Sequence, residues 1–276
     1  MATVCERRTF IKAVGAACIA PLIQPGSAST STEQSNVKFN PRGIQAIVFD
    51  TVGTLLDTYG TITRRGAQFT TARGLEVDWV RLLDQWRAEW RQQMDRVVAG
   101  TTPWVSTDII YRNALDKVLA AYDWGVRLSP DDRDQLNHLW YEIEPWPDTK
   151  AGLERLQKQY ILSTLSNGSM ASVVHMVKLG KLPFDCILTA ELVRSAKPDP
   201  KVYALATSSL NLRPDQILMA AAHKYDLAAA KKFGFSVAFI PRPFELGPHG
   251  KVDVTPEDYF DLTVPGVDGL AAALRA

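Results

Sequence analysis

The sequence has little net charge and few cysteines. Its 31 basic and 30 acidic side chains leave a formal net charge of +1 over 276 residues. So small a charge gives no long-range field of the kind that attracts nucleic acid or an anionic membrane surface. Beyond the N-terminal region the chain also lacks an apolar run long enough to span a membrane. We therefore expect no nucleic-acid partner and no membrane association of the mature chain.

The N-terminus carries the features of an export signal. Arg7 and Arg8 precede an apolar stretch that ends at Ile23, and small residues follow at positions 26–28. This order resembles a twin-arginine signal, whereas a basic amphipathic helix is the alternative. The resemblance implies a signal peptide over residues 1–28, a linker rich in Ser and Thr over 29–41, and a periplasmic location.

Cysteine usage sets a further limit on the mature chain. The protein has 3 cysteines, and only Cys186 lies beyond the expected cleavage site. An intramolecular disulfide is therefore excluded after cleavage, even in an oxidising compartment. We expect Cys186, inside the apolar run "FDCILTAE", to pack as a small buried hydrophobic residue.

Strand-like and helix-like segments alternate along most of the chain, whose 46% hydrophobic content suits one or two globular domains. Strands are expected at residues 44–49, 160–165, 186–190, 217–222 and 235–240. Helices are expected at residues 149–158, 169–179, 199–210 and 225–233. This alternation is typical of a Rossmann-like, doubly wound α/β fold with a parallel sheet.

The long interval between the first two expected strands shows a different pattern. Residues 59–146 contain no convincing strand, and in "WVRLLDQWRAEWRQQMDRVV" the apolar positions recur every three or four residues. We interpret 59–146 as a helical cap domain inserted after the first strand. The core domain then comprises residues 42–58 and 147–276, with a cleft between the cap and the sheet.

Polar residues follow most of the expected strands. They are Asp50, Ser166 with Asn167, Lys197, and His223 with Asp226. Reactive groups in an open parallel sheet gather at the carboxyl ends of the strands, so we expect these side chains to converge. Each has a structural alternative, such as capping a turn or starting a helix.

Four motifs occur together in the order typical of one known superfamily. They read "FDTVGTL", "LSNG", "KPDPKVY" and "YDLAAAKKFGF". Their order and spacing resemble the haloacid dehalogenase superfamily, and most closely its type II 2-haloacid dehalogenases, over residues 42–245. Because phosphatases share this fold, the resemblance alone does not decide the reaction.

The residue two positions after Asp50 separates these two branches. A phosphatase of this superfamily is expected to have an aspartate there, because an alkoxide leaving group needs a proton. This chain has Val52, which suits a halide, since halide leaves as a stable anion. Only Asp226 is available beside Asp50 as a further carboxylate, so we expect no metal and no other cofactor. Lys197 is the cation that would keep both carboxylates ionised.

The resemblance also implies roles for individual residues. Asp50 would be the nucleophile, with Lys197 beside it, and Asp226 would be the base that activates water. Thr54 and Ser166 would bind Asp50 or the substrate carboxylate, whereas turn hydroxyls are the alternative.

A second group of residues is expected to bind the halide and to position the reacting groups. Arg87 and Asn167 would bind the departing halide, although Arg87 on a solvated helix face is the alternative. Tyr203 would orient Lys197 or Asp50, or pack against the sheet.

The chain departs from the better-known type II members at the water-binding positions. Ala221, Ala222 and His223 stand where those enzymes have Ser-Ser-Asn, Tyr225 replaces a tryptophan-like wall, and Val52 replaces an aromatic residue. His223 would hold or deprotonate the hydrolytic water, or serve as a structural histidine.

The expected activity is therefore hydrolytic conversion of a 2-haloacid to a 2-hydroxy acid and halide through an aspartyl ester on Asp50. Two alternatives remain, a phosphatase that has lost its usual acid and a non-catalytic exported protein that binds a carboxylate. Whether the protein forms a homodimer is left open.

Overall fold

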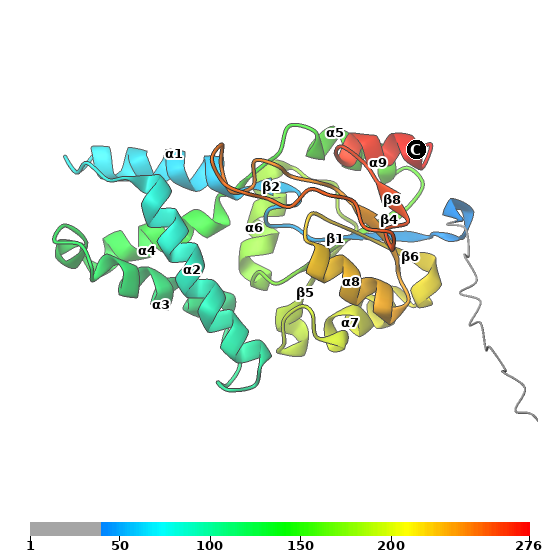
Figure 1. Cartoon of the computed structure of the whole chain (residues 1–276), viewed down its shortest axis with the longest axis horizontal. Helices are drawn as coiled ribbons and strands as arrows, with labels where there is room; N and C mark the ends of the chain where they lie inside the picture. Colours follow the sequence, from blue (N-terminus) through cyan, green and yellow to red (C-terminus); the bar gives the residue numbers. More distant parts are fainter. Residues whose placement is uncertain (1–39) are drawn as a thin grey trace, which may run out of the picture. The chain divides into compact units, whose positions relative to one another are not determined.

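The computed structural model describes residues 40–276, and their helices and strands form an α/β fold (Figure 1). The expected signal peptide and nearly all of the expected linker lie outside these described residues. A six-stranded parallel sheet has the order β5-β4-β1-β6-β7-β8. Its strands are β1 (Ala46–Phe49), β4 (Ile161–Ser166), β5 (Cys186–Thr189), β6 (Ile217–Ala221), β7 (Ser236–Phe239) and β8 (Leu262–Thr263).

Strand β1 lies inside the sheet and is buried on both faces. It pairs with β4 through Ala46 and Ile161 and with β6 through Ala46 and Ile217. All four β1 residues are buried; Ile47 and Phe49 enter one core and Val48 enters the other, as the two-residue period of a strand requires. Asp50, directly after β1, therefore sits at the carboxyl edge of the sheet between two neighbouring strands.

Helices cover both faces of the sheet. Helices α5 (Thr149–Leu156), α6 (Met170–Gly180) and α9 (Val267–Ala273) contribute to one hydrophobic core, and α7 (Pro200–Leu210) and α8 (Lys224–Phe233) contribute to the other. Short 3-10 helices lie at Pro41–Gly43, Gly125–Arg127, Leu139–Tyr141, Ala190–Val193 and Pro214–Gln216. The predicted doubly wound α/β fold is confirmed.

A helical insert leaves the core after β1, as predicted. It contains α1 (Thr58–Thr71), α2 (Trp79–Val98), α3 (Thr107–Leu119) and α4 (Pro130–His138). The insert departs and returns through a short antiparallel pair, β2 (Leu56–Asp57) and β3 (Glu144–Pro145). The domain boundaries at 59 and 146 stay a prediction, although this strand pair falls close to both.

The formation of helix α2 is explained by its N-cap residue and by the spacing of its apolar residues. The Asp78 carboxylate accepts a hydrogen bond from the Arg81 N–H and so caps the first turn. Leu82, Leu83 and Trp86 repeat at helical spacing and are buried in the core. Packing of this face fixes the orientation of α2, and so it also fixes the position of Arg87, the next residue of the helix. Within residues 40–276 no helix is both long and apolar enough to cross a membrane.

Candidate active site

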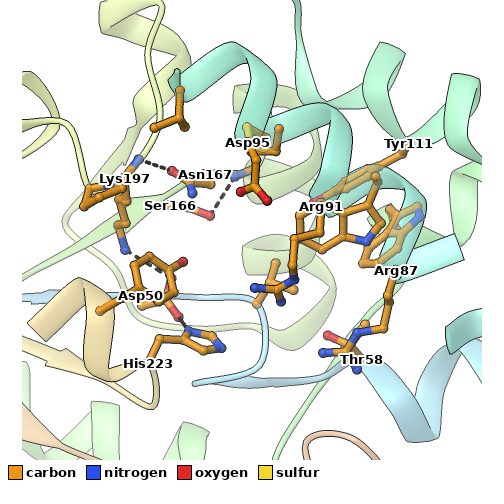
Figure 2. Close-up of a pocket in the computed structure, with 18 of the residues that line it drawn as sticks. Asp50, Thr58, Arg87, Arg91, Asp95, Tyr111, Ser166, Asn167, Lys197 and His223 are labelled. Carbon is orange, nitrogen blue, oxygen red and sulfur yellow. Dashed lines mark hydrogen bonds and ion pairs between the residues drawn. The ribbon is translucent and has the colours of Figure 1, made fainter. Parts of the chain in front are cut away.

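Asp50 is held at the carboxyl end of β1 by three side chains. Lys197 Nζ donates to Asp50 Oδ1 at 3.1 Å, and the Thr54 hydroxyl donates to Oδ2 at 2.6 Å. His223 Nδ1 lies 2.9 Å from the same Oδ2. Figure 2 shows Lys197 and His223 on either side of Asp50. Burial alone would raise the pKa of Asp50, but Lys197, His223 and Thr54 together hold it well below its usual range.

The turn after Asp50 brings the backbone close to these groups. Gly53 has φ +86°, in the left-handed region that other residues rarely adopt. A Cβ atom at Gly53 would lie 2.6 Å from Glu245 Oε1 and 3.2 Å from His223 Cε1. Glycine at this position therefore allows both the turn and the close approach of two site side chains.

Lys197 also binds Asp226. Its Nζ donates to Asp226 Oδ2 at 2.6 Å, and the Tyr203 hydroxyl donates to Asp226 Oδ1 at 2.8 Å. Burial and the nearby Asp50 raise the pKa of Asp226, whereas Lys197 and Tyr203 oppose this. Tyr203 thus contacts neither Lys197 nor Asp50 by a hydrogen bond, in contrast to the role suggested from the sequence. It fixes Asp226, which in turn fixes Lys197.

The carboxylates at this edge of the sheet do not fit the magnesium site of a phosphatase. Lys197 Nζ bridges Asp50 and Asp226. Both oxygens of Asp226 already accept hydrogen bonds, from Lys197 and Tyr203. Among residues 40–276 there is no cluster of three or more His, Cys, Asp or Glu side chains that could hold a metal ion.

His223 lies between two carboxylates. Its Nδ1 faces Asp50, and its Nε2 lies 3.0 Å from Glu245 Oε1. Burial alone would lower the pKa of His223, but the hydrogen bonds to Asp50 and Glu245 raise it to about 10. The two carboxylates therefore favour the imidazolium form, in which both ring nitrogens are donors. Glu245 stays ionised, because His223 and Arg87 outweigh its burial and lower its pKa.

Arg87 reaches the site from α2 in the insert. Its guanidinium donates to the backbone oxygen of Glu245 at 3.2 Å and to Glu245 Oε1 at 3.4 Å. Arg87 is buried and lines the pocket, so it does not lie on a solvated helix face. Glu245 follows β7 in an irregular segment and was not singled out from the sequence. It joins Arg87 of the insert to His223 of the core.

Ser166 and Asn167, at the end of β4, also line the pocket. The Ser166 hydroxyl lies 2.6 Å from the Thr51 hydroxyl and accepts a hydrogen bond from the Gly168 N–H, and it makes no hydrogen bond to Asp50. Asn167 Oδ1 accepts a hydrogen bond from the Lys197 N–H at 2.8 Å. This contact fixes the amide orientation and leaves the Asn167 Nδ2 group as a donor for a ligand.

These side chains surround a pocket of about 340 Å³. Val52 and Tyr225 line it, as expected, and the Tyr225 ring lies 5.9 Å from the His223 ring. Asp226, Thr54 and Tyr203 lie outside the lining and act through the residues they bind. Lining residues not anticipated from the sequence include Thr58, Trp90, Arg91, Met94, Tyr111, Trp140 and Glu245. The helical spacing of residues 87, 90, 91 and 94 is the sequence signal that would have identified the α2 members.

Known proteins share both the sequence and the fold. Residues 44–234 match the haloacid dehalogenase-like hydrolase family. The (S)-2-haloacid dehalogenase 4A of Burkholderia cepacia is 30% identical over 203 residues, 72% of this chain and 84% of the relative. A solved L-2-haloacid dehalogenase shows 35% identity and a TM-score of 0.81, covering 84% of this chain and 99% of that structure. A solved defluorinating L-2-haloacid dehalogenase shows 36% identity and a TM-score of 0.81, covering 84% and 96%. The chain belongs to the haloacid dehalogenase-like hydrolase family.

Proposed function

We propose that the protein is a hydrolytic dehalogenase that converts 2-haloacids, both haloacetates and (S)-2-haloalkanoates, to 2-hydroxy acids and halide. The observation that carries the proposal is Asp50, held by Lys197, Thr54 and His223 at the wall of a pocket, with Val52 where a phosphatase needs an acid. Relatives named as (S)-2-haloacid dehalogenases support the same conclusion. The chemistry of the site then gives a role to each side chain around Asp50.

In the first step, a carboxylate oxygen of Asp50 attacks C2, and the carbon–halogen bond breaks. Lys197, Thr54 and His223 hold the carboxylate in one orientation, which favours an attack along a single line. The products of this step are an aspartyl ester and a halide ion. The halide departs on the side of C2 opposite to Asp50, and so toward the insert.

Departing halide needs donors that are already in place. Arg87 supplies a permanent positive charge, and its bonds to Glu245 fix its guanidinium before the substrate arrives. Asn167, after β4, supplies an amide N–H. We assign both to the halide, and the charge on Arg87 makes it the stronger of the two.

The second step is hydrolysis of the ester, and here we favour His223 as the base. Asp226 is buried, does not line the pocket and already binds Lys197 and Tyr203. His223 lines the pocket within hydrogen-bond distance of the Asp50 carboxylate. Formation of the ester removes the negative charge of Asp50, which lowers the pKa of His223 and allows it to lose a proton to solvent. Asp226 is then a positioning residue for Lys197.

These groups account for every proton that moves during the reaction. Neutral His223 takes a proton from the attacking water and gives it to the alkoxide oxygen of the leaving 2-hydroxy acid. Asp50 is regenerated as a carboxylic acid and returns its proton to His223, which restores the starting ion pair. The single proton released per turnover is the one that His223 loses after the ester forms. Glu245 stabilises the imidazolium each time it appears.

The test of this function is a halide-release assay on the purified protein. The panel contains chloro-, bromo- and fluoroacetate and both enantiomers of 2-chloropropionate, with an aryl phosphate as the comparison substrate. We expect halide from the haloacetates and from the (S)-enantiomer, and none from Asp50→Asn. Phosphate release, or release of neither anion, would instead support the phosphatase or the carboxylate-binding protein.

We also propose export to the periplasm through the twin-arginine pathway, on the strength of Arg7, Arg8 and the small residues at 26–28. Replacing both arginines by lysine keeps the charge but removes the signal that the receptor reads. Precursor should then remain in the cytoplasm, and periplasmic delivery of this double variant would contradict the proposal.

A further inference from the structure

The pocket is longer than a small haloacid requires. Its 340 Å³ lies within the range of roughly 300–1,000 Å³ that holds drug-sized ligands, whereas a haloacetate has only two carbon atoms. Helix α2 lines it with Arg87, Trp90, Arg91, Met94, Asp95 and Val98. These residues recur every three or four positions and so share one face of the helix. At about 1.5 Å per residue, this face extends for about 16 Å.

The two ends of this face lie on opposite sides of Asp50. Arg87 binds Glu245, which binds His223. Met94 packs with Ala196, the residue before Lys197. Because Asp50 contacts both His223 and Lys197, the helix crosses the pocket from the His223 side to the Lys197 side (Figure 2). The α2 residues beyond Arg87 have no task in the two chemical steps.

The part of the pocket along these residues is mainly apolar and partly rigid. Trp90, Met94 and Val98 line it from α2, and Tyr111 and Trp140 lie beside Trp90. The rings of Tyr111 and Trp140 stack at 4.2 Å between centroids, which gives one wall little freedom to collapse onto a small substrate.

Two charged residues flank the apolar surface. Arg91 and Asp95 also line the pocket, and they are one helical turn apart on α2. Because they carry opposite charges, this rim has no net charge that would select a second carboxylate. An apolar group therefore suits the surface better than an anionic one.

We propose that the enzyme acts on 2-haloacids with a long apolar substituent at C2, which lies along α2 against Trp90, Met94 and Val98. This inference rests on the proposed dehalogenase function. Displacement in line places Asp50 and the halide on opposite sides of C2, so the remaining substituents point along the pocket. At the exposed end, where Val98 is 43% accessible, a longer chain can extend into solvent.

The test is a substrate series of (S)-2-bromopropanoate, 2-bromobutanoate and 2-bromohexanoate, with bromoacetate as the reference. Each buried methylene should raise kcat/KM roughly three- to fourfold until the apolar part is filled. Since the substituent is bound equally in the ground and transition states, the gain should come from a lower KM and not from a higher kcat.

Variants of the apolar surface test where the chain lies. Met94→Gln keeps the side-chain length but adds a polar group, and Val98→Asn changes a more exposed position, so it tests the same surface if the first variant folds poorly. Both should lower the kcat/KM ratio of 2-bromohexanoate to bromoacetate by roughly threefold or more. Val80→Asn is the matched control, because Val80 is 45% accessible on the same helix and does not line the pocket.

The outcomes separate this inference from the function on which it rests. Turnover of bromoacetate with equal or falling kcat/KM along the series would overturn the inference and leave the dehalogenase function standing. A preference for 2-bromosuccinate over 2-bromohexanoate would place a second carboxylate on Arg91 and would also overturn it. Failure to release bromide from any substrate would remove the function itself.

Discussion

At the scale of single residues, the chemistry depends on how one carboxylate is surrounded. Asp50 has a cation on each side, Lys197 and His223, and a hydroxyl from Thr54 that also accepts the Ala222 N–H at 2.9 Å. An aspartate that only capped a turn would need no buried cation. The arrangement instead keeps Asp50 ionised and fixed in orientation, as an attacking oxygen must be.

The ion pair of His223 should be visible in the pH dependence of stability. The pKa of His223 is raised from 6.5 to about 10 in the folded protein, so its stabilising effect is complete below pH 6.5 and is lost as the pH rises through 10. Wild-type protein should therefore exceed His223→Gln in Tm most clearly near pH 6, with the gap closing toward pH 10. A Tm difference that stays constant across this range would contradict an imidazolium at this site.

Loss of the same histidine should uncouple the two chemical steps. His223→Gln removes the base but leaves Asp50, so halide should appear in a burst of about one equivalent per enzyme while ester hydrolysis slows by roughly two orders of magnitude or more. Quenched-flow halide release and mass spectrometry of the Asp50 peptide measure both steps. His138→Gln, outside the pocket, serves as the control. Steady turnover of His223→Gln at the wild-type rate would show that another group is the base.

Much of this residue-scale arrangement follows from strand order. Asp50, Lys197 and His223 were predicted to meet because each follows a strand of one parallel sheet, and they do. Glu245 was not predicted, because it lies in an irregular segment with no motif and reaches the site only through the path of that segment after β7. The contact of Tyr203 with Asp226 likewise depends on packing that the sequence pattern does not specify.

At the scale of elements, the strands and helices that alternate along the chain were predictable, whereas the short elements near the C-terminus were not. Helix α2 shows its buried face directly in the spacing of Leu82, Leu83 and Trp86. Strand β8 has only Leu262 and Thr263, too few residues to show a two-residue period, and its pairing with β7 is supplied by the completed sheet. Helix α9 is also short and was not predicted from its own sequence pattern. In the structure it packs on α5.

Helix α2 carries the residue that should govern halide departure. Arg87→Lys keeps the charge but loses the planar group that binds Glu245 in two places, so ester formation should slow by roughly two orders of magnitude or more. Pre-steady-state halide release measures this step directly. Arg81→Lys, exposed on the same helix and outside the pocket, should keep the wild-type rate. An unchanged rate in Arg87→Lys would show that Arg87 does not assist halide departure and only links α2 to the segment that holds Glu245.

At the scale of the whole molecule, the fold does not determine which reaction is catalysed. The residues of the active site decide between dehalogenase and phosphatase. The sheet and its insert are an arrangement that phosphatases share, so neither the strand order nor the cap distinguishes the two activities. The residue that distinguishes them is Val52, two positions after Asp50. The sequence predicted Val52 as the deciding residue and Lys197 as the cation beside both aspartates, and the structure shows an ion pair of Lys197 with each of them.

The site as a whole should work without a divalent cation. Lys197 Nζ contacts both carboxylates that a magnesium ion would need, and we therefore expect full halide release after exhaustive EDTA treatment and no gain from added Mg²⁺. A halide-selective electrode follows both conditions. Complete loss of turnover on chelation, restored by Mg²⁺, would contradict this account of the site.

The covalent role of Asp50 is tested most directly by a single turnover in heavy-oxygen water. If Asp50 attacks C2, the product hydroxyl takes its oxygen from the Asp50 carboxylate, and solvent oxygen enters Asp50 only when the ester is hydrolysed. Inverted configuration at C2 would be shared by direct attack of water, so stereochemistry does not separate the two routes. The account predicts label in the Asp50 peptide and none in the 2-hydroxy acid. Labelled product with an unlabelled Asp50 would show that Asp50 is a general base and that no aspartyl ester forms.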